Sequence, residues 1–115
     1  MDLPSEPIDP GIADTAPLTR REIADLLPEV PDWLLVDGRL SARFACRDFS
    51  GALDLLCEIA RFAAQEGHLP DVGIREGRMV DVAWYSYAIG GLSQNDFIMA
   101  ARLSDRLRSR RGGPL

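Results

Sequence analysis

Residues 66–71 read Glu-Gly-His-Leu-Pro-Asp, and residues 87–96 read Tyr-Ala-Ile-Gly-Gly-Leu-Ser-Gln-Asn-Asp. Gly67 indicates the end of a helix, because glycine readily adopts the left-handed backbone conformation found at helix C-termini. Ser93 and Asp96 form a capping box, in which a hydroxyl and a carboxylate three residues apart bond free N–H groups at the start of a helix. The two motifs therefore enclose a segment that leaves one helix and enters another.

The enclosed segment is expected to be a β-hairpin. Residues 72–75 and 79–87 are its strands, joined across Glu76-Gly77, and the longer strand is rich in β-branched and aromatic residues. Residues 33–36 and 40–46 predict an earlier hairpin, because the Asp-Gly pair between them readily takes the positive φ angles of a tight turn. Four side chains alternate onto one face of the earlier hairpin and should point at the helices: Leu40, Ala42, Phe44 and Cys46.

Three segments have helical periodicity. The first is short, opens with a Thr-x-x-Glu capping box at Thr19 and stops at Pro28. The second begins at a cap formed by Asp48 or Ser50 and runs to about Gln65. The expected apolar stripes are Ile23, Leu26 and Leu27 in the first helix, Leu53, Leu56, Ile59, Ala60 and Ala63 in the second, and Phe97, Ala100, Ala101, Leu103 and Leu107 in the third, which follows Ser93.

The expected element order is α-β-β-α-β-β-α. This order favours an α+β fold, with a four-stranded antiparallel sheet and three helices on one face. We divide the chain into a Pro-rich acidic extension over residues 1–17, which is expected to be disordered, a folded domain over residues 18–108, and a flexible Arg/Gly tail over residues 109–115.

Composition excludes several classes of function. The formal net charge is −5, and affinity for duplexes comes largely from neutralising phosphates, so nucleic acid is not an expected partner. No apolar run is long enough to cross a membrane and no secretion signal opens the chain, so we expect a cytoplasmic protein. Cys46 and Cys57 are expected to be buried free thiols, and neither a metal nor a cofactor is expected.

The two opening motifs resemble those of the pterin-4a-carbinolamine dehydratase family. That family typically shows His-His-Pro-Asp, then a β-hairpin, then Thr-His-x-x-Gly-Gly-Leu-Thr/Ser-x-x-Asp. Weaker matches, such as Pro31-Asp32-Trp33 where the family usually has Pro-Gly-Trp, extend the resemblance over residues 18–107. The shared frame consists of His68, Pro70, Gly91, Leu92, Ser93 and Asp96.

The resemblance implies a histidine-based site from which two histidines are missing. Dehydrating a 4a-hydroxytetrahydropterin moves one proton onto a departing hydroxyl and another off a ring nitrogen, which suits imidazole with its reference pKa of about 6.5. His68 matches the first family histidine, whereas Leu69 replaces the second and Tyr87 the third. Leucine cannot carry a proton, and a phenol with a pKa of about 10 is a poor base at neutral pH. His68 and Tyr87 are therefore vestigial candidates, and no catalytic residue is expected.

The first functional hypothesis is a non-catalytic protein that uses the dehydratase fold for protein–protein interaction. Such a protein is similar to one branch of the family. Members of that branch are encoded with α-carboxysomes, lack the histidine set and assist RuBisCO assembly. The resemblance implies RuBisCO subunits as partners, a carboxysome-associated location and a homodimer. Aromatic residues and arginine are enriched at binding hot spots, so the candidate surface is Arg75, Arg78, Met79, Trp84, Tyr85 and Tyr87. The alternative is that half of these residues face the core or a dimer seam.

The second hypothesis is a weak or altered 4a-hydroxytetrahydropterin dehydratase, in which His68 works with Tyr87 and solvent. It predicts turnover that depends on His68. For His68 the alternative to a catalytic role is a histidine in a helix-to-strand loop that caps backbone groups. The Gly-Gly pair before the third helix lacks the flanking pattern of a phosphate loop and is interpreted as a turn.

Overall fold

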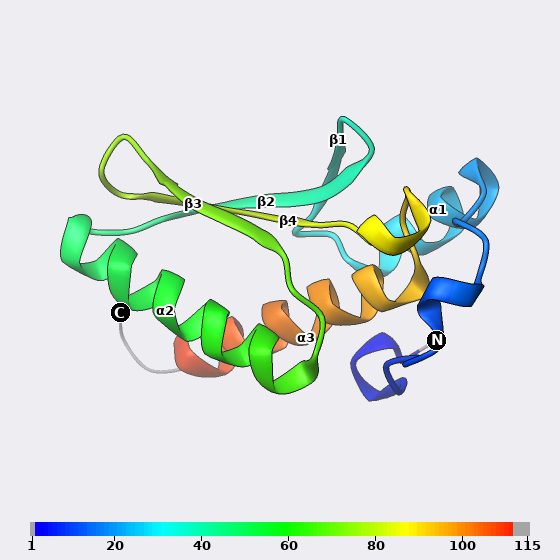
Figure 1. The fold of residues 1–115 in the computed structure, drawn as a ribbon. Coiled ribbons are helices and arrows are strands. Elements are labelled where there is room, and N and C mark those ends of the chain that lie inside the picture. Colours follow the sequence, from blue (N-terminus) through cyan, green and yellow to red (C-terminus); the bar gives the residue numbers. More distant parts are fainter. Residues whose placement is uncertain (1, 112–115) are drawn as a thin grey trace.

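The structure, a computed structural model, describes residues 2–111 (Figure 1). Its four strands form one sheet in the order β1-β2-β4-β3, and all neighbouring strands are antiparallel. The regular elements are α1 (Arg20–Leu26), β1 (Leu34–Val36), β2 (Arg39–Ala45), α2 (Phe49–Glu66), β3 (Asp71–Arg75), β4 (Met79–Trp84) and α3 (Gln94–Arg111). Four short 3-10 helices are η1 (Leu3–Ser5), η2 (Ile12–Asp14), η3 (Leu27–Glu29) and η4 (Tyr87–Ile89).

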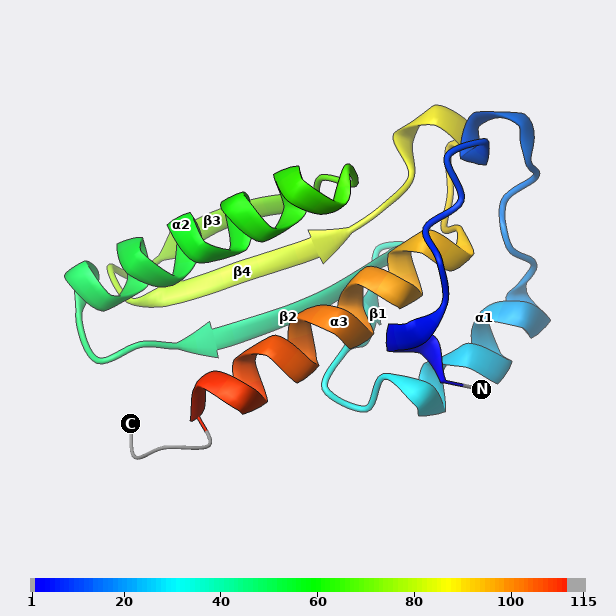
Figure 2. The same cartoon turned by 90° about the horizontal axis from the view of Figure 1, so that it is seen from below.

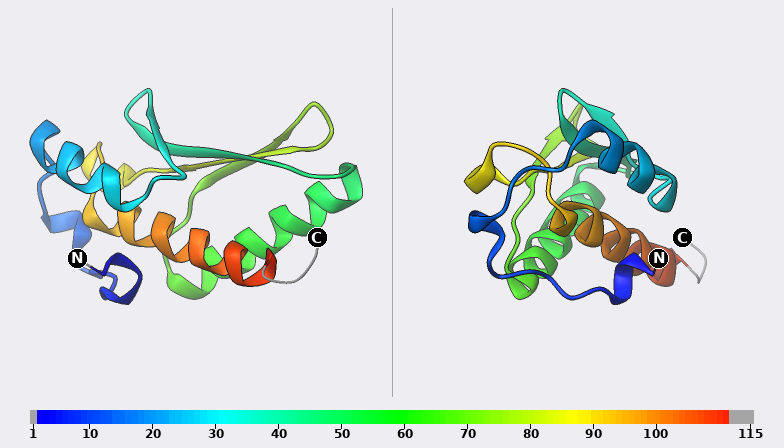
Figure 3. Two further views of the ribbon diagram at one scale, coloured as in Figure 1. Left: turned by 180° about the vertical axis from the view of Figure 1, so that it is seen from behind. Right: turned by 90° about the vertical axis from the view of Figure 1, so that its right-hand side faces the viewer.

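The sheet has one covered face and one open face. Helices α2 and α3 run lengthwise beneath the covered face, and α1 lies beside one end of the sheet (Figures 1, 2 and 3). The covered face carries alternate residues of the strands, such as Leu40, Val80 and Val82, which are almost completely buried. The predicted α+β class, with a four-stranded antiparallel sheet and three helices, is confirmed.

Local sequence signals fix the helix ends. Thr19 and Glu22 form both bonds of the predicted capping box, at 3.2 and 2.8 Å, and Asp48 rather than Ser50 caps α2 by accepting from the Gly51 N–H at 2.8 Å. Gly67 ends α2 with a φ of 77°. The chain therefore turns sharply at Gly67, and this turn places the next residue, His68, under the sheet rather than further along the helix axis.

The face that α2 buries differs from the expected one. Ala52, Leu55, Ile59, Phe62 and Ala63 are buried, whereas Leu53 is 42% exposed. Cys57, which was expected to be buried, is exposed, and Cys46 is half-buried. Because α2 carries apolar residues on two sides, periodicity alone allowed either stripe to face the sheet, and the packing of Phe62 and Leu55 decides between them.

The N-terminal segment was expected to be disordered, but in residues 2–17 η1 packs against α3 and η2 packs against η4. Leu3 is 1% exposed and belongs to the hydrophobic core. Asn95 accepts a hydrogen bond from the Asp9 N–H and donates one to the Asp9 carbonyl, each at 2.9 Å. Arg102 donates to the carbonyls of Pro4 and Glu6 at 3.0 and 2.6 Å. Partners far along the chain therefore hold a segment whose own composition favours disorder. We call residues 2–17 the N-terminal arm.

The C-terminal boundary also differs in part. Residues 109–111, expected to begin a flexible tail, continue α3. The remainder of that expected tail, residues 112–115, lies outside the described residues.

Candidate functional site

His68 sits between the end of α2 and the start of β3. Its Nε2 atom lies 2.6 Å from the Oδ1 atom of Asp96, at the start of α3. Its ring lies parallel to the indole of Trp84, with 5.9 Å between centroids and 10° between planes. The His68 side chain is 13% exposed. The imidazole is therefore held on one side by an aromatic face and at Nε2 by a carboxylate.

Asp96 connects the two sequence motifs that enclose the second hairpin. Its carboxylate is fully buried, and its Oδ2 atom accepts bonds from the Ser86 hydroxyl at 2.8 Å and the Ser93 N–H at 2.9 Å. The Ser86 and Ser93 hydroxyls are 2.7 Å apart. A buried carboxylate needs such donors, because an unpaired charge in the interior is costly. Asp96 thus caps α3 and orients His68 with the same side chain.

The two positions where the family places its other histidines lie at the surface. Leu69 is 66% exposed and Tyr87 is 61% exposed. The Tyr87 hydroxyl donates to Asp71 at 2.5 Å and accepts from the Arg39 guanidinium at 2.9 Å. The hydrogen bond to Asp71 raises the pKa of Tyr87 above its usual value, with a smaller contribution from burial. At neutral pH the phenol at position 87 is therefore a hydrogen-bond donor and cannot act as a base.

Arg39 completes a second cluster beside the histidine site. Its guanidinium lies 4.2 Å from the centroid of the Tyr85 ring and 5.1 Å from that of Tyr87, and it is 3.5 Å from the Asp71 carboxylate. A cation above an aromatic face gains electrostatic attraction. Arg39, the first residue of β2, thus contacts both Tyr85 and Tyr87, and Asp71, the first residue of β3, bonds Tyr87.

The profile of the family described as "Pterin 4 alpha carbinolamine dehydratase" matches residues 16–106. The chain belongs to the pterin-4a-carbinolamine dehydratase family. The match covers the whole sheet, α1, α2 and most of α3, and it leaves out most of the N-terminal arm.

Named relatives of this dehydratase family agree with that assignment. A protein of Cupriavidus pinatubonensis named "Putative pterin-4-alpha-carbinolamine dehydratase 1" is 38% identical over 105 residues, which cover 90% of each chain. A similarly named protein of Microcystis aeruginosa is 35% identical over 111 residues, covering 93% of this chain and 95% of that one. A solved structure described as a transcriptional coactivator/pterin dehydratase from Brucella melitensis has a TM-score of 0.67 and 27% identity, covering 77% of this chain and 96% of that chain.

The pterin dehydratase fold separates the six residues proposed for partner binding. Trp84 is fully buried on the helix side of β4, so the prediction that it lies on an exposed surface was wrong. Side chains alternate along a strand, and Trp84 falls on the covered face of the sheet. Arg75, Arg78 and Tyr87 are exposed, whereas Met79 and Tyr85 are half-buried. The predicted strand extends only to Trp84, and Tyr87 lies in η4.

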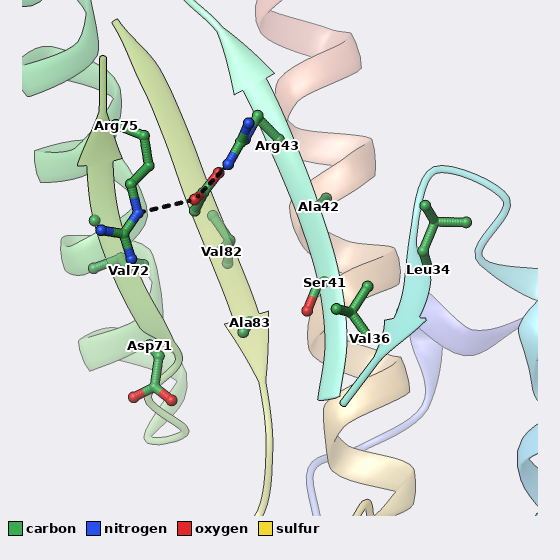
Figure 4. Close-up of a pocket in the computed structure, with 12 residues that line it drawn as sticks. Leu34, Val36, Ser41, Ala42, Arg43, Asp71, Val72, Arg75, Val82 and Ala83 are labelled. Carbon is green, nitrogen blue, oxygen red and sulfur yellow. Dashed lines mark hydrogen bonds and ion pairs between the residues drawn. The ribbon is translucent and has the colours of Figure 1, made fainter. Parts of the chain in front are cut away.

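The open face of the sheet has a shallow hollow of about 440 Å³ (Figure 4). Small residues such as Ser41, Gly73 and Ala83 line its middle, and Leu34 lies at one side. At the other side, Arg43 and Arg75 both contact the Asp81 carboxylate, at 2.6 and 3.3 Å. The hydrogen bond from Arg43 holds the pKa of Asp81 below its usual value and raises that of Arg43 itself.

The hollow was missed by sequence reasoning, as were the roles of Ser86, Arg39 and Asp71 at the site. For Ser86 a signal existed, because it precedes Tyr87 where the family pattern has threonine before histidine. For the others no local pattern pointed to the contacts. Among residues 2–111, no three His, Cys, Asp or Glu side chains gather in a way that would hold a metal ion. None of the described helices is long and apolar enough to span a bilayer.

Proposed function

We propose that this dehydratase family member is an interaction protein rather than an efficient enzyme, and that RuBisCO subunits are the first client to test. The observation that carries the proposal is the state of the three histidine positions. One holds His68, which is engaged by Asp96 and Trp84, one holds the exposed Leu69, and one holds Tyr87, which donates to Asp71. A positioned acid or base typically contributes about 10²- to 10⁴-fold to a rate, so losing two is severe.

The proposed client surface is the open side of the sheet. Arg75 borders the hollow on this side, Arg78 and Tyr87 are exposed, and Met79 and Tyr85 are half-buried. The hollow between Leu34 and Arg75 offers a concave apolar floor next to charged groups. Interfaces commonly combine aromatic and arginine residues with an apolar centre. Under this proposal the protein works in the cytoplasm, in association with carboxysomes, and as a homodimer.

A weak 4a-hydroxytetrahydropterin dehydratase is the second candidate, and one observation favours it. His68 is held 2.6 Å from a fully buried carboxylate and stacked on an indole, which is the kind of orientation that a catalytic imidazole needs. In this candidate His68 exchanges protons with the pterin, and Asp96 sets the orientation of its ring. For the Tyr87 hydroxyl to donate a hydrogen bond to the substrate, its single proton has to leave Asp71.

A stopped-flow assay separates the two candidates. Breakdown of 4a-hydroxytetrahydropterin is followed with the wild-type protein, with His68→Ala and with an uncatalysed blank at neutral pH. The interaction proposal expects all three rates to agree. Turnover that His68→Ala abolishes, in a variant that circular dichroism shows to be folded, would replace the proposal with the dehydratase.

A binding measurement tests the client. Purified RuBisCO large and small subunits are titrated against the wild-type protein, Arg75→Glu/Arg78→Glu, and the control Arg21→Glu, which changes an exposed arginine on α1. The proposal expects the double variant to lose binding about tenfold or more and the control to retain it, because charge reversal replaces attraction by repulsion at the interface. Equal binding by all three proteins, or by none, would reject this client surface.

A further inference from the structure

A short loop between β4 and α3 carries two residues of the candidate site. Two backbone hydrogen bonds between Ser86 and Gly91, at 3.1 and 3.4 Å, close this loop, which we call the 86–91 loop. The Ser86 hydroxyl donates to the buried carboxylate of Asp96, and the Tyr87 hydroxyl donates to the first residue of β3. The position of the loop therefore decides whether both side chains reach their partners.

The N-terminal arm ends directly against this loop (Figures 2 and 3). A Cβ atom added at Gly91 would lie 2.7 Å from the Cβ and 3.3 Å from the Cγ of Pro17. Carbon atoms in contact normally lie about 3.5–4.0 Å apart, so the proline ring fills the space in which a side chain would stand. The backbone of Gly91 is not in the left-handed region, so its conformation does not itself call for glycine. A residue without a side chain is required at position 91 because Pro17 packs there.

The chain is fastened on both sides of Pro17. On the C-terminal side, the Leu18 N–H donates to the Leu92 carbonyl at 2.8 Å. On the N-terminal side, η2 packs against η4, and Asn95 bonds the N–H and the carbonyl of Asp9, each at 2.9 Å. The proline ring also fixes its own φ angle. The arm therefore holds Pro17 against the loop as a fixed contact, whereas an ordinary side chain could rotate away.

We infer that Pro17 is a positioning residue for the candidate site: by packing on Gly91 it fixes the 86–91 loop, and the loop in turn places Ser86 and Tyr87 against their partners. The docked arm and the ordered site then form one cooperative unit, so that loosening either loosens the other. This coupling goes beyond the proposed function. It holds whether the protein is an interaction protein or an enzyme.

Hydrogen exchange followed by NMR tests the contact in the variant Gly91→Ala. Alanine suits the backbone at this position, but its methyl group has to displace Pro17. We expect the Ser86 amide, whose bond to the carbonyl of residue 91 closes the loop, to exchange with solvent about fivefold to tenfold faster. An unchanged rate in this variant would overturn the inference.

The matched control is Pro17→Gly/Gly91→Ala. Once the ring is gone, the added methyl group lies 3.9 Å from the Cα atom of residue 17, which is an ordinary contact. Pro17→Gly alone should also speed exchange of the Ser86 amide, because it removes the contact from the other side. The double variant should agree with Pro17→Gly within about twofold, since alanine at position 91 then displaces nothing. If the two single effects multiply instead, alanine itself disturbs the loop and the inference fails.

The titration of Tyr87 gives a second readout, which a general loss of stability would not move. Asp71 raises the pKa of Tyr87 by accepting its hydrogen bond, and Arg39, which faces the same hydroxyl, lowers this pKa by less. In a Tyr85→Phe background, where Tyr87 is the one tyrosine left, Gly91→Ala should therefore lower the midpoint toward the ordinary value of about 10.

Adding Pro17→Gly to that Tyr85→Phe/Gly91→Ala variant should give the same midpoint as Tyr85→Phe/Pro17→Gly. Circular dichroism checks that each variant is folded at the pH of the measurement. If the Ser86 amide exchanges faster while the Tyr87 midpoint stays where it was, the arm holds the backbone of the loop without positioning the site, and the inference is overturned.

Discussion

The imidazole of His68 lies parallel to the indole of Trp84, with ring centroids 5.9 Å apart. Trp84 is fully buried and comes from the end of β4, whereas His68 follows α2. The stack therefore joins the helix layer to the sheet at the level of the Asp96 carboxylate. This position makes both residues structural members of the core as well as members of the candidate site, and stability measurements can separate the two roles.

The two tryptophans should respond differently to replacement by phenylalanine. Trp33 donates from Nε1 to the Ser104 hydroxyl at 2.8 Å, whereas the Nε1 of Trp84 finds no hydrogen-bond partner in residues 2–111. Both side chains are buried, so the loss of volume is similar. We expect Trp33→Phe to lower the free energy of unfolding by about 1 kcal/mol more than Trp84→Phe, because only Trp33 gives up a hydrogen bond. Urea unfolding measures both, and the reverse order would show that the indole N–H of Trp84 is satisfied in solution.

Replacing His68 should weaken the fold even if the protein has no dehydratase activity. His68→Ala leaves one oxygen of the fully buried Asp96 carboxylate without its partner. We expect the free energy of unfolding to fall by about 1–3 kcal/mol, the usual cost of an unsatisfied buried group. The neighbouring Leu69→Ala is the control and should change it by less than about 0.5 kcal/mol, because Leu69 is exposed. Equal effects in chemical denaturation would contradict a structural role for the pair.

The N-terminal arm should loosen when its contact with Asn95 is removed. Asn95→Ala deletes both hydrogen bonds to the backbone of Asp9. We expect the Asp9 amide to exchange with solvent about fivefold to tenfold faster, which corresponds to the loss of roughly one net hydrogen bond. Hydrogen exchange followed by mass spectrometry measures this, with Ser109→Ala on the same helix as the control. An unchanged rate would mean that Leu3 and Arg102 alone hold the arm.

Tyr87 should ionise at higher pH than a free phenol. Its pKa is raised, first by the hydrogen bond to Asp71, so the neutral phenol is the favoured form in the folded protein. The stabilisation is fully present below about pH 10 and is lost as the pH rises through the folded-state pKa. Absorbance near 295 nm follows this titration in a Tyr85→Phe variant. Adding Asp71→Asn should lower the midpoint, and a midpoint that does not move would exclude Asp71 as the cause.

Much of the fold follows from short-range sequence rules. The capping box at Thr19, the cap at Asp48 and the left-handed Gly67 are local signals, and the structure contains all three. The two hairpins are each turned by a pair of residues with positive φ angles, whereas the pairing of β2 with β4, which joins them into one sheet, is long-range. At the site, His68 and Tyr87 were found by their resemblance to a family pattern, and that pattern also supplied the neighbouring Asp96.

The features that sequence reasoning missed depend on distant partners. The arm contains four prolines and no basic residue, yet Arg102 and Asn95 on α3 provide the bonds that order it. The orientation of α2 is chosen by packing, because apolar residues occupy two of its faces. Trp84 was placed on the surface from its residue type, whereas strand alternation sends it into the core. No local pattern decides the first two points, whereas alternation along β4 is a local pattern that decides the third.

Because Leu3 is buried, the chain cannot be shortened to the family match without opening the hydrophobic core. The family match starts at residue 16, but the hydrophobic core starts at residue 3. A fragment trimmed to the recognised domain would expose the strip of α3 that Leu3 covers and would leave Arg102 without its two carbonyl partners. Domain boundaries taken from family profiles would therefore cut this protein inside its own core.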